Sequence, residues 1–250
     1  MDLRLEGRGA LVTGASAGIG RAIARALARE GARVAATGRR RDALESLEAE
    51  IVAAGGAKPT LIVHDALKDG YVEALASAAE GGVGPLGILV NNAGGSRNFG
   101  KDATEAQWQE ALTLNFTRHR QLAMRLLPGM GERKWGRIIN ITGKMEPDNV
   151  NGAFCAKAAL TAWSKGLSRE VGKMGVTVNC IAPGRIMSDQ IRRNYTPEYR
   201  AWQSEHEIPM GRYGEPEELA DLAAFLASPR AQYITGIVYH FDGGLRRYQY

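Results

Sequence analysis

The chain has 250 residues, of which 44% are hydrophobic and 24% are charged, a balance typical of a globular domain in water. No apolar run approaches the roughly 18 residues of a membrane span, and residues 1–6 carry charges of both signs, unlike a secretion signal, so we expect a cytoplasmic protein without a membrane partner. The net charge of +5 comes from basic residues interspersed with acidic ones, and no nucleic-acid-binding motif is present, which argues against a nucleic-acid partner.

Short apolar runs alternate with helical patterns along the whole chain. Thr104 and Gln107 form a capping box before a long helix that ends near Pro128, and Pro216 opens the last helix. Such alternation predicts an α/β fold: one doubly wound parallel sheet, Rossmann-like, with helices on both faces, forming a single domain over residues 1–250. Strands are expected at 10–13, 34–36, 61–63, 88–90, 138–141, 176–181 and 237–241, and a helix at 153–173.

Residues 185–214, which follow the sixth predicted strand, lack a regular pattern and are rich in polar and aromatic side chains. Ligands of open α/β sheets bind outside the carboxyl ends of the strands. A long insertion at a strand end is therefore expected to be a substrate lid.

The two cysteines, Cys155 and Cys180, lie far apart and match no metal-binding pattern, so no metal site is predicted. Cys180 belongs to an apolar strand and is expected in the core. Cys155 is expected to be a small packed residue on a helix.

Residues 13–20, Thr-Gly-Ala-Ser-Ala-Gly-Ile-Gly, follow the first predicted strand and open the first helix. Glycines let the backbone approach a diphosphate, whose charge is met by the N-terminus of the helix. In this context of strand, turn and helix the motif favours a dinucleotide site.

This turn and five further motifs occur in the order found in the short-chain dehydrogenase/reductase family. The chain resembles that family over essentially its whole length. The other motifs are Asn91-Asn92-Ala93-Gly94, Asn115, Lys157 followed by two alanines, Pro183-Gly184 and Asp242-Gly243-Gly244.

The resemblance implies a set of cofactor contacts. Gly14, Ser16, Gly18 and Ile19 would line the diphosphate, and Asp65 would hold the adenine. The two riboses and the nicotinamide would be contacted by Asn92, Ala93, Gly94, Lys157, Pro183, Gly184, Ile186 and Ser188.

The end of the second strand bears on the choice between NADP and NAD. Relatives that prefer NAD place an acidic residue where this chain has Gly38, and Arg39 follows it. A guanidinium suits a 2′-phosphate, although Arg39 on its own could also be a plain surface charge. The basic residue that other NADP-binding relatives place before the second glycine of the turn is absent, because that position is Ala17. We expect NADP, with NAD as the alternative.

The catalytic set of the family, Asn, Ser, Tyr and Lys, is incomplete. Asn115 and Lys157 match it, but Ala153 stands four residues before Lys157, at the tyrosine position. Gly143 stands at the serine position, where Thr142 is the nearest hydroxyl that could serve instead. A missing general acid costs about 10² to 10⁴ in rate, so the proton must come from another group if carbonyl chemistry continues.

Two functions remain open. The favoured one is an NADP(H)-binding oxidoreductase that acts on a small carbonyl or alcohol substrate with an atypical proton donor, because the expected cofactor contacts are kept. The other is a non-redox enzyme (a lyase, hydrolase or isomerase) or a cofactor-sensing protein on the same fold. The candidate donors are Lys144, Glu146, Asp148, Tyr195, Tyr199 and His206.

Assembly is the last expectation. Relatives commonly form tetramers, packing their long helices, here around Trp108 and Ala159, and their final strand against partner copies. A monomer would expose Tyr248 and Tyr250 at the chain end, so we expect a homo-oligomer, a tetramer.

Overall fold

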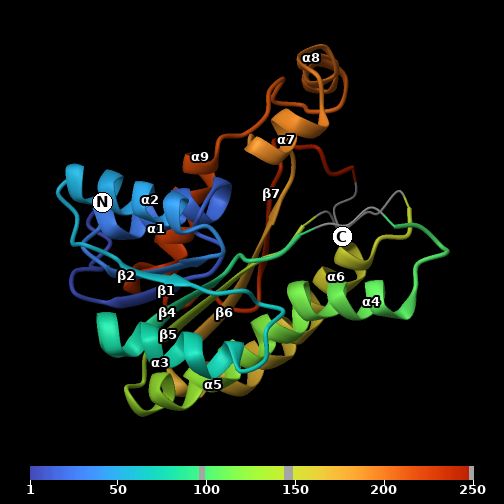
Figure 1. Cartoon of the computed structure of the whole chain (residues 1–250). Helices are drawn as coiled ribbons and strands as arrows, with labels where there is room; N and C mark the ends of the chain where they lie inside the picture. The colour runs from blue at the N-terminus through green and yellow to red at the C-terminus, as the bar shows by residue number, and fades with distance from the viewer. Residues whose placement is uncertain (96–98, 144–148, 248–250) are drawn as a thin grey trace.

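The computed structural model describes residues 1–95, 99–143 and 149–247. Its centre is a seven-stranded sheet in the order β3-β2-β1-β4-β5-β6-β7, with every neighbouring pair parallel (Figure 1). This confirms the predicted fold class. The strands are β1 (Gly9–Val12), β2 (Arg33–Gly38), β3 (Thr60–Val63), β4 (Leu86–Asn91), β5 (Gly136–Ile141), β6 (Val176–Pro183) and β7 (Val238–Phe241).

Helices cover both faces of the sheet. One face carries α1 (Gly18–Arg29), α2 (Arg41–Ala53) and α9 (Pro216–Ala227), and the other carries α3 (Tyr71–Val83), α5 (Arg118–Glu132) and α6 (Gly152–Val171) (Figure 1). Each face has its own hydrophobic cluster. The central strands are buried on both faces, which explains why they read as continuous apolar runs rather than alternating ones.

The long helix differs from the prediction. It comprises α4 (Glu105–Leu112), a π turn (Thr113–Thr117) and α5, and it continues past Pro128 to Glu132. The predicted capping box of Thr104 and Gln107 is present. Pro128 removes one backbone donor but does not end the helix, because buried side chains on both sides, including Leu126 and Met130, anchor that turn in the core.

Residues 185–214, predicted to be a lid and called the lid segment below, are more regular than expected. They contain α7 (Asp189–Asn194) and α8 (Pro197–His206). Ser188 caps α7 by accepting the N–H of Ile191, and Thr196 caps α8 in the same way before Pro197. The prediction missed these helices because each is short and has no buried stripe of its own.

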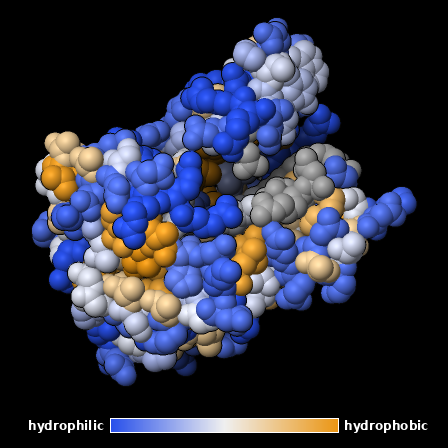
Figure 2. All heavy atoms as spheres, viewed as in Figure 1, coloured by the Kyte–Doolittle hydropathy of each residue, from blue (hydrophilic) through white to orange (hydrophobic). Residues whose placement is uncertain are grey.

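Backbone hydrogen bonds anchor the base of the lid segment. The N–H of Met187 donates to the carbonyl of Gly214, and the N–H of Gly214 donates to the carbonyl of Arg185. From this base the mostly hydrophilic lid segment stands over a hollow beside the rest of the molecule (Figure 2). The hollow lies where the carboxyl ends of the strands meet.

The remaining helical turns are the 3-10 segments Gly172–Met174 and Pro229–Ala231. Cys180 is buried as expected, whereas Cys155 is exposed on α6, so the prediction of a packed residue there was wrong. Within the described part of the chain, the helices lack the length and apolar character that spanning a membrane demands.

Candidate functional site

A cavity of about 570 Å³ opens where the strand order reverses, between β1 and β4, and this volume is within the range of small-molecule sites. Every cofactor-binding residue predicted from the sequence lines it, except Lys157, Pro183 and Gly184. The structure adds a further set of lining residues: Ala17, Thr37, Gly38, Arg40, His64, Ala66, Leu67, Tyr71, Leu114, Asp189 and Arg193.

The floor of the cavity is fixed by Thr13. Its hydroxyl oxygen accepts the N–H groups of Asn92 and Ala93, both at 2.9 Å, and donates to the carbonyl of Val90 at 3.2 Å. Gly14 follows with φ of +67°, and a Cβ at this position would lie 2.9 Å from the Cα of Ala93. The turn therefore needs glycine here for both its conformation and its close contact with the neighbouring strand end.

The N-terminus of α1 faces this cavity and fits an anion. Its N-cap residue, Ala17, offers no side chain to the first N–H groups, and the first turn contains no acidic residue. Gly18, with φ of +53°, lines the same space. Free N–H donors at the positive end of a helix dipole suit a diphosphate, so these residues fit a dinucleotide.

Asn115 lies in the π turn and is fully buried. Its Oδ1 accepts the N–H of Gly95 at 3.2 Å, and its Nδ2 donates to the carbonyls of Gly95 and Ala111. A π turn is a frequent feature of functional sites because it reorients one side chain relative to the helix. Here it directs Asn115 onto the segment that follows β4.

His119 is a site residue that the sequence analysis missed. It lies one helical turn after Asn115, and its Nε2 is 2.6 Å from the carbonyl of Ala93. Burial, helped by the positive charge of Lys157, lowers the pKa of His119 to about 4, so the ring is neutral and Nε2–H is the donor. Among the described residues its Nδ1 has no hydrogen-bond partner. The spacing of four from Asn115 was the available signal.

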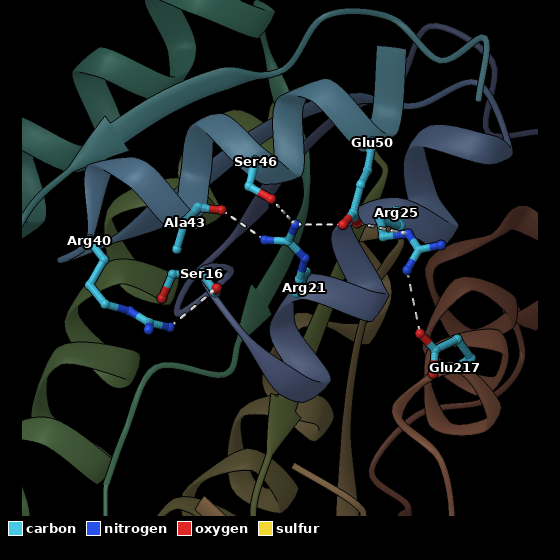
Figure 3. A network of polar contacts seen from close by, with 8 residues as sticks. All are labelled: Ser16, Arg21, Arg25, Arg40, Ala43, Ser46, Glu50 and Glu217. Atoms are coloured by element: carbon cyan, nitrogen blue, oxygen red, sulfur yellow. Dashed lines mark hydrogen bonds and ion pairs between the residues drawn. The ribbon is translucent and has the colours of Figure 1, made fainter. Parts of the chain in front are cut away.

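The end of β2 is crowded in a way that bears on cofactor choice. A Cβ on Gly38 would lie 3.0 Å from the Cβ of Ser16, so an acidic side chain would not fit there unless its neighbours moved. Arg39 and Arg40 both line the cavity, and Nη2 of Arg40 lies 3.4 Å from the carbonyl of Ser16 (Figure 3). The sequence pattern predicts Arg39 at this site but not Arg40.

Arg21 fixes the start of α2, just beyond these arginines. It donates to the carbonyl of Ala43, to the hydroxyl of Ser46 and to Glu50 (Figure 3). The first turn of α2 is thereby tied to α1. The backbone that carries Arg39 and Arg40 is held beside the glycine turn.

Lys157 lies at the other end of the site. Its ammonium donates to the carbonyl of Thr142 at 2.7 Å and lies 3.4 Å from the carbonyl of Ile141. Burial lowers the pKa of Lys157 to about 8. A Cβ on Gly143 would lie 3.4 Å from Cδ of Lys157, so the lysine stem is in ordinary contact with the position predicted for the family's serine.

Thr142 is not directed into the cavity. Its hydroxyl is buried and donates to the carbonyl of Ile181 at 3.2 Å, next to the backbone bond between the same two residues. This hydroxyl extends the pairing of β5 with β6. Pro183 ends β6, and the N–H of the next residue, Gly184, donates to the carbonyl of Phe241.

The lid rings predicted as proton donors lie outside the cavity lining. Tyr195, Tyr199, Trp202 and His206 stack in sequence along the lid segment, with ring centroids 5.5, 6.0 and 5.0 Å apart. The other predicted donors, Lys144, Glu146 and Asp148, lie outside the described residues.

Comparison with known proteins gives a consistent result. Residues 14–246 match the family described as enoyl-(acyl carrier protein) reductase. The 3-oxoacyl-[acyl-carrier-protein] reductase of Vibrio cholerae is 37% identical over 247 residues, which are 97% of this chain and 99% of that protein.

Solved structures agree with this match. L-sorbose reductase from Gluconobacter frateurii, complexed with NADPH and L-sorbose, aligns with a TM-score of 0.93 and 32% identity, covering 99% of this chain and 100% of that one. The 3-oxoacyl (acyl-carrier-protein) reductase from Agrobacterium tumefaciens C58 with NADP bound aligns with a TM-score of 0.91 and 33% identity, covering 97% and 96%.

His119 yields a prediction about stability. A histidine has a pKa of about 6.5 when unfolded, and that of His119 is about 4 when folded, so its contribution is complete above pH 6.5 and is lost as the pH falls towards 4. The loss approaches ~1.4 kcal/mol per pH unit. His119→Gln keeps an N–H donor for Ala93 but does not titrate, so urea unfolding between pH 7 and pH 5 should destabilise the wild type more steeply than the variant. Parallel curves would contradict this.

Proposed function

The chain belongs to the short-chain dehydrogenase/reductase family, and we propose that it is an NADP(H)-dependent reductase of a small carbonyl compound that uses an atypical proton donor. The observation that carries this proposal is the continuous cavity along the glycine turn, the end of β2 and the segment after β4. Relatives that act on 3-oxoacyl groups and on L-sorbose favour carbonyl reduction over the non-redox or sensing alternatives. When bound, NADP(H) supplies or accepts the hydride.

The residues divide the work of binding. The glycine turn and the N-terminus of α1 hold the diphosphate, and Arg39 with Arg40 holds the 2′-phosphate. Asp65 holds the adenine. Thr13, Asn115 and His119 fix the segment from Asn92 to Gly95 that passes the riboses. The lid segment, within a single domain of residues 1–250, covers the substrate.

We propose that Lys157 itself donates the proton to the substrate oxygen. With alanine at the predicted tyrosine position, Lys157 provides an acid whose stem lies beside Gly143, where no serine side chain intervenes. The pKa of Lys157, about 8, lies close to physiological pH, where a general acid is most effective. In reduction, the carbonyl carbon gains hydride, the oxygen takes a proton from Nζ, and water reprotonates the amine.

The cofactor assignment predicts that NADPH binds more tightly than NADH. Gly38 brings no acidic repulsion, and Arg39 pairs with the additional phosphate. Arg39→Ala should weaken the binding of NADPH by about tenfold, the contribution of one charge-assisted hydrogen bond, and leave the affinity for NADH nearly unchanged. Fluorescence titration of both cofactors measures this, and equal affinities in the wild type would refute the assignment.

The proton-donor proposal predicts a pH profile. An acid must be protonated to donate, so the rate of reduction should be flat below pH 8 and fall about tenfold per unit above it, following the pKa of Lys157. Lys157→Arg keeps the positive charge but does not release a proton near neutral pH, and it should lower turnover by about 10² or more. NADPH absorbance with 3-oxoacyl thioesters and ketoses provides the assay.

The double variant Ala153→Tyr with Gly143→Ser is the control. Ala153 is 3% exposed, so a phenol there must displace its neighbours, whereas a Cβ at 143 would be in ordinary van der Waals contact with the stem of Lys157. Turnover should therefore fall. A gain of about 10² or more would show instead that the protein is a weakened reductase of the usual kind.

We also propose a homotetramer. Among the described residues, β7 is an edge strand paired with β6, and its flank exposes Ile237 at 43%, features that a partner copy would cover. Light scattering at micromolar concentration should give four chain masses, and Ile237→Asp should reduce that mass. A monomeric wild type would contradict the proposal. Tyr248 and Tyr250, the basis of the sequence argument, lie outside the described residues.

A further inference from the structure

The lid segment contributes an arginine to the wall of the cofactor cavity. Arg193 lies in α7 and lines the cavity together with Ser188 and Asp189. Asp189 and Arg193 are four residues apart, so they share one face of α7. Among the described residues, Arg193 has no hydrogen bond or ion pair that occupies its guanidinium.

The start of α7 lies against the glycine turn. A Cβ on Gly18 would be 3.7 Å from the Cβ of Ser188, which is ordinary van der Waals contact. Ser188 is also the N-cap of α7, so the orientation of this short helix is set beside the turn. Gly18 and the α7 residues Asp189 and Arg193 therefore line one cavity, with Ser188 as the contact between turn and helix.

The charges around the cavity are consistent with a diphosphate-binding role for Arg193. The turn itself offers no cation, because Ala15, Ser16 and Ala17 stand between its first two glycines. The other arginines in the cavity lining, Arg39 and Arg40, follow β2, at the end assigned to the 2′-phosphate. Asp189 adds a negative charge to the cavity lining, which an anion would avoid unless a cation accompanied it.

We propose that Arg193 binds the cofactor diphosphate from the lid side, and so couples occupation of the cavity to closure of the lid segment. This inference rests on the proposed cofactor function. A guanidinium bonds to two phosphate oxygens at once, which would hold α7 in its contact with the glycine turn. Bound cofactor would then hold the lid segment in place before the substrate enters.

Arg192 provides a matched control, since it lies on the same helix and is exposed but does not line the cavity. Fluorescence titrations compare Arg193→Ala and Arg192→Ala with NADPH, NADH, ADP and 2′-AMP. Arg193→Ala should weaken the binding of NADPH, NADH and ADP by the same factor, about tenfold, and leave the affinity for 2′-AMP unchanged. Arg192→Ala should match the wild type with all four ligands.

Hydrogen exchange gives a readout independent of affinity. Saturating NADPH should protect the amides of α7 in the wild type and in Arg192→Ala, but much less in Arg193→Ala. The proposal would be overturned if the two variants showed equal affinities and equal protection of α7. It would also be overturned if Arg193→Ala lost affinity for NADPH and 2′-AMP alone. A wild type that binds neither dinucleotide would overturn the proposed function and this inference together, whereas wild-type binding without a selective effect of Arg193→Ala overturns the inference alone.

Discussion

The hydroxyl of Thr13 is the contact on which the site depends. It joins the first turn after β1 to the segment after β4. The order of the strands in the sheet reverses between these two strand ends. From the opposite side, Asn115 and His119 hold the same segment by its backbone. Side chains from one strand end and one long helix thus define a wall made largely of main chain, and a wall of main chain recognises the shared parts of a dinucleotide rather than any one substrate.

The sequence predicts the sheet well because each strand is a buried apolar run and each crossover helix has its own periodicity. It also predicts the glycine turn, since Gly14 requires a conformation that other residues rarely adopt. It does not predict Arg40, His119 or Arg193 as site residues. Their roles depend on which strand ends become neighbours and on how the lid segment returns to Gly214, and these are tertiary facts.

The position of Thr142 shows that strand register decides whether a hydroxyl can serve in the site. A hydroxyl next to the predicted serine position is a reasonable candidate by spacing alone. Strand register turns it towards Ile181, however, and Gly143 takes the position facing Lys157. With a glycine there and an alanine four residues before the lysine, the end of β5 presents the lysine stem and little else that ionises among the described residues.

The stacked rings of Tyr195, Tyr199, Trp202 and His206 have a mechanical consequence. Each ring limits the rotamers of the next, so this face of the lid segment has lost much of its side-chain entropy before any ligand arrives. Tyr199 and Trp202 remain 44% and 47% exposed, so the order comes from the rings themselves rather than from the core. We therefore expect the side chains on this face of α8 to lose little further entropy when a ligand or partner surface orders against them.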